Sequence, residues 1–63
     1  MPFIVVNGPP LKDLARKRAV VAGITAVIAK EYGQAPENIT VLIREDPAEN
    51  VAVAGKLLSD RKG

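Results

Sequence analysis

Two strands that are apolar on both faces flank one long helix in a chain of only 63 residues. Residues 2–7 are β-branched or aromatic on both faces as far as Asn7, and residues 39–45 are apolar on both faces as far as their charged end. Strands of this kind are typical of parallel sheets that are buried on two sides. A single helix covers one face of a sheet, so the pattern predicts that other copies of the chain cover the second face and the open edges.

The segment between the strands carries the signals of one helix. Asp13 is a suitable N-cap, the helical pattern continues to about Tyr32, and Gly33 suits the left-handed position that ends a helix. From Ala19 onward the helix is apolar nearly all round, which requires cover on more than one side. Residues 16–18 are three cations in its first turns, where they are unfavourable unless they meet carboxylates or an anionic ligand.

The order of elements defines the fold class. Strand, helix and strand with short connections predict a right-handed βαβ unit whose two strands are parallel. After a turn at Asp46-Pro47, residues 51–55 predict a short extended segment or hairpin arm, and residues 56–63 predict a charged tail with two leucines. We therefore predict an α+β fold in which residues 1–63 form a single domain with a short C-terminal hairpin.

Composition excludes several classes of function. The chain has no histidine and no cysteine, which excludes a zinc site, a Ser-His-Asp triad, a Cys-His pair and a disulfide framework. The apolar fraction of 48% is too high for disorder, and a net charge of +2 is too small to predict nucleic acid as a partner. No signal peptide and no membrane-spanning run is expected, and a small chain without cysteine is typical of a reducing compartment, so we expect a cytoplasmic protein.

Pro2 is the remaining candidate for chemistry. Removal of an initiating methionine before a small residue leaves the secondary amine of this proline at the N-terminus. An apolar pocket and nearby cations disfavour the protonated form of such an amine and make it a usable base at neutral pH. Lys12 and Arg44 are cations of the right type for this effect. A proline at the first residue of a strand is also common for structural reasons alone.

Four segments carry a resemblance that covers essentially the whole chain. They are Pro2-Phe3-Ile4-Val5, residues 16–18 with Ile24-Thr25, residues 35–41, and residues 43–51 followed by Gly55. Together and in this order they resemble the 4-oxalocrotonate tautomerase family. The resemblance implies a tautomerase-like protomer assembled as a homohexamer, a trimer of dimers, without metal or cofactor. It also implies that Pro2 acts as general base and acid in enol–ketone conversion of an unsaturated 2-hydroxy or 2-oxo acid.

The resemblance assigns further positions one by one. The family's arginine before the helix, which binds the substrate carboxylate, falls on Lys12; lysine keeps the charge but loses the bidentate guanidinium. A second arginine falls on Thr40, and an aromatic residue of the hairpin falls on Val51, as in a branch of small tautomerase-like proteins that carry valine there. Arg44 shares a strand face with Thr40 and is the candidate for the missing cation, and Arg61 in the tail is a second one.

Two alternative functions stay open at this point. The same scaffold supports hydration or dehalogenation of an unsaturated acid if the proline is protonated and Glu45 or Glu49 activates water. The chain is also compatible with a non-catalytic subunit of a hetero-oligomer whose partner supplies the missing arginine and aromatic residue. The sequence does not rank linear dienols against aryl pyruvate enols as substrates.

Overall fold

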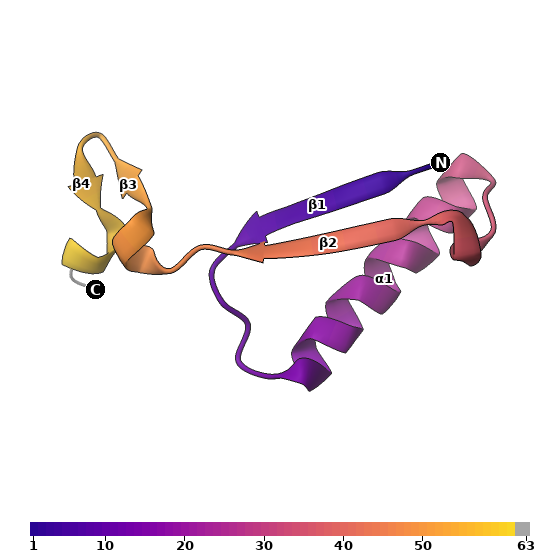
Figure 1. The fold of residues 1–63 in the computed structure, drawn as a ribbon, viewed down its shortest axis with the longest axis horizontal. Helices are drawn as coiled ribbons and strands as arrows, with labels where there is room; N and C mark the ends of the chain where they lie inside the picture. Colours follow the sequence, from indigo (N-terminus) through magenta and orange to yellow (C-terminus); the bar gives the residue numbers. More distant parts are fainter. Residues whose placement is uncertain (62–63) are drawn as a thin grey trace.

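The computed structural model describes residues 1–61 and shows a βαβ unit followed by a separate hairpin (Figure 1). The main elements are β1 (Phe3–Gly8), α1 (Leu14–Tyr32), β2 (Thr40–Glu45), β3 (Ala52–Val53) and β4 (Lys56–Leu57). Three short 3-10 helices join or follow them: η1 (Pro36–Asn38), η2 (Ala48–Asn50) and η3 (Leu58–Asp60). The predicted α+β fold, with two parallel strands, one long helix and a C-terminal hairpin, is confirmed.

The two faces of the sheet formed by β1 and β2 differ. The strands pair in parallel, from Phe3 opposite Thr40 to Gly8 opposite Glu45. Exposure alternates along both strands, so that α1 half-buries one face and leaves the other exposed. We call the exposed set the open face; its members are Phe3, Val5, Asn7, Thr40, Leu42 and Arg44. The half-buried set is Ile4, Val6, Gly8, Val41, Ile43 and Glu45. Apolar side chains therefore lie on both faces, as the sequence pattern indicated, and on the open face they alternate with Asn7, Thr40 and Arg44.

Each strand starts one residue later than the sequence pattern predicts. Residue 8 belongs to β1 because the carbonyl of Gly8 accepts a hydrogen bond from the N–H of Asp46 at 2.8 Å. Pro9 has no N–H to continue the pairing. Ile39 lies outside β2 because its N–H donates to the carbonyl of Pro36 at 3.1 Å and so closes η1 instead.

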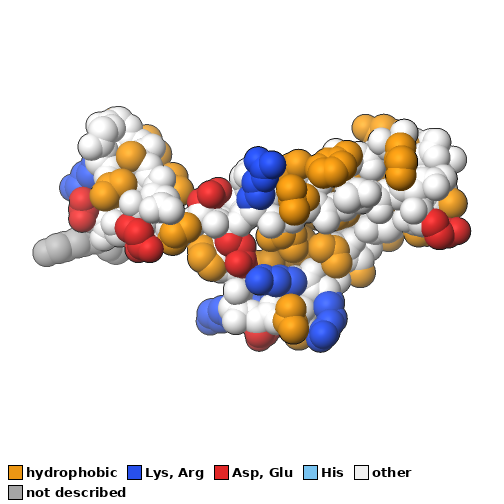
Figure 2. Space-filling model, viewed as in Figure 1, with side chains coloured by type: hydrophobic (Ala, Val, Ile, Leu, Met, Phe, Trp, Pro, Cys, Tyr) orange, Lys and Arg blue, Asp and Glu red, His pale blue; other side chains and the backbone are white. Residues whose placement is uncertain are grey.

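Both predicted ends of α1 are confirmed. The Asp13 side chain accepts a hydrogen bond from the N–H of Arg16 at 2.9 Å, and Gly33 adopts the left-handed conformation with φ 64°. Lys17, one of the three early cations, meets a carboxylate, that of Glu45, at 3.3 Å. Basic side chains gather around this end of the helix (Figure 2). No helix within residues 1–61 has the length and apolar character required to cross a membrane.

The described chain has no hydrophobic core. No side chain among residues 1–61 is buried, and an apolar groove of about 590 Å³ runs open along the outer flank of α1. The accessible surface is 4943 Å², whereas a compact monomer of this mass exposes about 3,900 Å². The radius of gyration is 15.0 Å, against about 10.6 Å for a compact chain of this length. Apolar side chains are correspondingly exposed over the strands and over the hairpin (Figure 2).

The segment after β2 is a hairpin that extends away from the sheet, and we call residues 48–61 the arm (Figure 1). The prediction of a charged tail from residue 56 is wrong for β4, which pairs antiparallel with β3. The pairing is possible because Ala54 and Gly55 both have positive φ, 55° and 80°, as a two-residue hairpin turn requires. Residues 62 and 63 of the predicted tail lie outside the described residues.

Replacing Ala54 by glycine should stabilise the arm. A left-handed conformation costs an L-residue about 1–2 kcal/mol, and the greater freedom of glycine in the unfolded chain offsets about 0.4–1 kcal/mol of the gain. We expect Ala54→Gly to raise the melting temperature at fixed protein concentration. Ala52→Gly, within the extended β3, is the matched control and should lower it. A melting temperature of Ala54→Gly at or below wild type would contradict the strain at this turn.

Candidate active site

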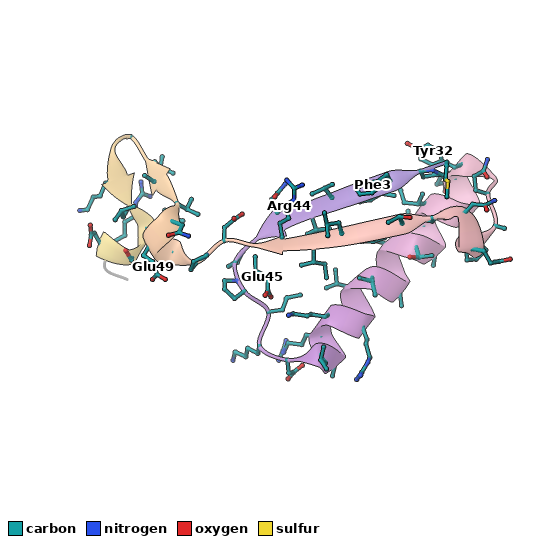
Figure 3. All side chains as sticks on the ribbon, viewed as in Figure 1. Phe3, Tyr32, Arg44, Glu45 and Glu49 are labelled. Carbon is teal, nitrogen blue, oxygen red and sulfur yellow. The ribbon has the colours of Figure 1, made fainter. Side chains whose placement is uncertain are left out.

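Pro2 lies at the start of the parallel sheet. Its carbonyl accepts a hydrogen bond from the N–H of Thr40 at 3.2 Å, and the residue is half-buried. Because α1 runs antiparallel to β1, this end of the sheet lies beside the C-terminal end of the helix (Figure 1). Phe3 and Tyr32, both largely exposed, lie at the same end (Figure 3). The end of the protomer that carries the candidate base therefore also carries two exposed aromatic side chains.

Two of the candidate cations lie at the opposite end of the sheet. Arg44 is in register with Asn7, five residues along β1 from Pro2, which corresponds to about 16 Å of extended strand. Lys12 lies in the loop that leaves the same end of β1 and enters α1. One protomer therefore does not bring Pro2 together with either cation.

Arg44 and Arg61 occupy different parts of the molecule. Arg44 is exposed on the open face together with Thr40, and Figure 3 shows it pointing to the opposite side of β2 from Glu45. Arg61 follows η3 at the end of the arm, where its N–H donates to the carbonyl of Leu58 at 3.1 Å. The arm leaves the sheet at the end opposite Pro2 (Figure 1), so Arg61 also lies away from Pro2 within one chain.

A cleft of about 260 Å³ lies between the far end of β1 and the arm. Val51, at the position of the family's aromatic residue, lines this mostly apolar cleft, and the Leu58 N–H holds it there by donating to the Val51 carbonyl at 2.8 Å. The other lining residues are Asn7, Gly8, Pro9, Asp46, Ala48 and Leu58. Sequence reasoning missed this cleft because its walls come from segments about forty positions apart. Within residues 1–61 no three acidic side chains gather in a way that would hold a metal ion.

Glu45, the last residue of β2, is hydrogen-bonded to the loop that contains Lys12. One carboxylate oxygen accepts a hydrogen bond from the N–H of Leu11 at 2.8 Å, and the other lies 3.3 Å from the Lys17 ammonium. The hydrogen bond from Leu11, assisted by Lys17, lowers the pKa of the Glu45 carboxyl from its ordinary value of 4.5, against a partial desolvation that raises it. Both oxygens are engaged and the carboxylate is a weak base, so the structure gives no support to Glu45 as the group that activates water.

The sequence contains a signal for this role of Glu45 that the sequence analysis passed over. The two-residue period of β2 places Glu45 on the same face as Val41 and Ile43, where it faces α1. A carboxylate on the covered face of a strand requires partners, and here they are Leu11 and Lys17.

The lowered pKa of Glu45 predicts a pH dependence of stability. A carboxyl whose pKa is lower in the folded state contributes stability above its unfolded pKa, and this contribution is lost as the pH falls through the folded value. Wild-type melting temperatures should therefore fall as the pH is lowered below about 4.5. Glu45→Gln should show a shallower fall over the same range at the same protein concentration, whereas the exposed Glu49→Gln should follow the wild-type slope. Equal slopes for wild type and Glu45→Gln would contradict the prediction.

Comparison with known proteins decides the family. The model of a family described as "Tautomerase enzyme" matches residues 2–61. The chain belongs to the tautomerase family. Among similar proteins, the 2-hydroxymuconate tautomerase of Bacillus subtilis (strain 168) is 35% identical to this tautomerase over 60 residues, which cover 95% of the chain and 97% of that relative.

Solved structures agree with this family assignment. DmpI from Archaeoglobus fulgidus is 49% identical, with a TM-score of 0.85 over 94% of the tautomerase described here and 100% of that chain. YwhB, a homologue of 4-oxalocrotonate tautomerase, is 33% identical, with a TM-score of 0.89 over 97% and 100% of the two chains. The predicted membership of the 4-oxalocrotonate tautomerase family is confirmed, and the protein is an isomerase. The roles of Pro2, Lys12, Arg44 and Arg61 stay predictions.

Proposed function

We propose that this tautomerase converts an unsaturated 2-hydroxy acid to its 2-oxo isomer, with Pro2 as the proton carrier. The observation that carries the proposal is the position of Pro2, at the first matched residue of the tautomerase family and half-buried at the start of the sheet. Removal of Met1 frees its secondary amine. The amine takes the proton of the 2-hydroxyl group, the electron pair shifts into the carbon chain as a dienolate, and the protonated amine returns the proton to carbon.

The complete site lies between copies of the chain. Pro2 is at one end of the sheet and Lys12 and Arg44 are at the other, so a two-fold, antiparallel association brings the base of one copy to the cations of its neighbour. The exposed open face and the absence of buried side chains within residues 1–61 support assembly of single-domain protomers, as a homohexamer built from three dimers.

Each remaining residue then has a defined role. Lys12 binds the substrate carboxylate as a point charge. Arg44 stabilises the negative charge that develops on the 2-oxygen in the dienolate, because a cation placed where charge appears lowers the barrier. Val51 lines the apolar wall at this end of the sheet. Arg61, on the arm, is the second candidate for the carboxylate.

A substrate panel tests the proposed function. Purified protein whose intact mass shows removal of Met1 is mixed with 2-hydroxymuconate, as a linear dienol with two carboxylates, and with an aryl enolpyruvate, which has one. Ultraviolet absorbance follows the loss of enol. We expect saturable turnover with the higher kcat/KM for the dicarboxylate, because the site presents more than one cation. Decay of both enols at the buffer rate would contradict the proposal, and a retained Met1 would leave a non-catalytic subunit as the function.

A further inference from the structure

We propose that Glu45 is a positioning residue that fixes Lys12 for binding the substrate carboxylate. The inference rests on the proposed function, since Lys12 is assigned to the carboxylate there. It is carried by one long-range hydrogen bond, from the Leu11 N–H to the Glu45 carboxylate at 2.8 Å, which joins residues 34 positions apart.

The loop between β1 and α1 offers few backbone donors, so the bond from Leu11 determines where Lys12 lies. Pro9 and Pro10 have no N–H, so Leu11 offers the only backbone donor between Gly8 and Lys12. The chain on the other side of Lys12 is held by the Asp13 cap, but that bond is local to the start of α1 and spans three residues. Within residues 1–61, the hydrogen bond to the Glu45 carboxylate is therefore the one that ties this stretch to the sheet.

Glu45 is itself held firmly enough to act as an anchor. It is the last residue of β2, on the face toward α1, and its side chain is only 29% exposed. Lys17 of α1 contacts the second carboxylate oxygen at 3.3 Å, and the next residue, Asp46, donates its N–H to the Gly8 carbonyl at 2.8 Å. The carboxylate at the end of β2 thus contacts both the first turns of α1, through Lys17, and the residue that precedes Lys12.

The hydrogen bond between Glu45 and Leu11 matters because the residue that it positions, Lys12, is a lysine and not an arginine. A lysine carries a flexible stem and a point charge, so it lacks the planar, bidentate fork by which arginine orients a carboxylate on its own. Orientation must then come from the backbone that carries the lysine, and a mobile backbone loses the advantage of a preorganised site. Loss of the anchor should weaken substrate binding while leaving the proton transfer at Pro2 unchanged.

Steady-state kinetics of three single variants test whether substrate binding is weakened while proton transfer is unchanged. We expect Glu45→Ala to raise KM for 2-hydroxymuconate about tenfold, with kcat within about twofold of wild type, because uniform binding is lost. Glu45→Gln retains a carbonyl oxygen that accepts from Leu11, so its KM should lie closer to wild type, within about threefold. Glu37→Gln removes an exposed carboxylate on η1 and should leave both constants unchanged.

A double-mutant cycle shows whether Glu45 acts through Lys12. If it does, adding Glu45→Ala to Lys12→Ala should leave KM at the value of Lys12→Ala alone, because the group being positioned is already absent. An equal tenfold rise in both backgrounds would overturn the inference, as would a fall in kcat with unchanged KM.

Amide hydrogen exchange tests the inference even if no substrate is turned over. The Leu11 amide should be protected in wild type and exchange faster in Glu45→Ala, while the amides within α1 keep their protection. Glu45→Gln, whose side-chain carbonyl still accepts from Leu11, should lie between the two. Unchanged exchange at Leu11 in Glu45→Ala would overturn the inference. A wild-type protein without turnover would instead contradict the proposed function, and the exchange result would still report on the anchor.

Discussion

Pro2→Ala should lower kcat for enol–ketone conversion by about 10²–10⁴-fold, the usual contribution of a positioned general base. Alanine at this position still allows removal of Met1, but it replaces a ring nitrogen of fixed orientation by a freely rotating primary amine. The fold should be unaffected because Pro2 contributes only its carbonyl to the sheet, as acceptor for the Thr40 N–H, and alanine has the same carbonyl.

The measurement for Pro2→Ala combines stopped-flow absorbance with sedimentation. Pro36→Ala, at the exposed first residue of η1 before β2, is the matched control and should keep both activity and oligomer mass. A kcat of Pro2→Ala within about twofold of wild type, with the N-terminus shown to be free, would remove Pro2 from the mechanism. Loss of assembly in the same variant would show a structural role instead.

Phe3→Asp should break the assembly. Phe3 is the most exposed apolar residue of the open face, at 63%, and Val5 and Leu42 lie on the same face. Burial of a phenylalanine in a subunit contact contributes about 1.5–3 kcal/mol, and an unpaired carboxylate at the same place adds a penalty of several kcal/mol. The expected loss of about 4 kcal/mol per subunit corresponds to about a thousandfold weaker association.

Dissociation should unfold the chain as well. No side chain among residues 1–61 is buried within the protomer, so a separated chain has no core to hold α1 against the sheet. Sedimentation and far-ultraviolet circular dichroism should therefore change together for Phe3→Asp. Gln34→Asp, which adds the same charge in an exposed loop, should retain the wild-type mass and helical signal. A Phe3→Asp protein of unchanged mass would show that the open face is not an interface.

Local signals in the sequence predicted the protomer well because they act over a few residues. The Asp13 cap and the glycine after α1 defined the helix to the residue, and the two-residue period assigned the faces of both strands. The error at the end of β1 arose because a distant bond decided the outcome at Gly8, whose partner is Asp46. The error at the start of β2 arose because the Ile39 N–H closes η1 instead of pairing with β1. The hairpin turn at Ala54 was hidden because alanine rarely adopts positive φ.

In the candidate site, too, the sequence determines some features and the tertiary structure determines others. Its residue types, a proline able to carry a free amine and cations able to hold a carboxylate, are determined by the sequence alone, since chemistry belongs to the side chain. Only the tertiary structure decided that Pro2 and Lys12 lie at opposite ends of one protomer, and that the Glu45 carboxylate accepts a hydrogen bond from the loop at Leu11. Such relations join residues tens of positions apart, and they arise from strand register and helix direction, which no local pattern encodes.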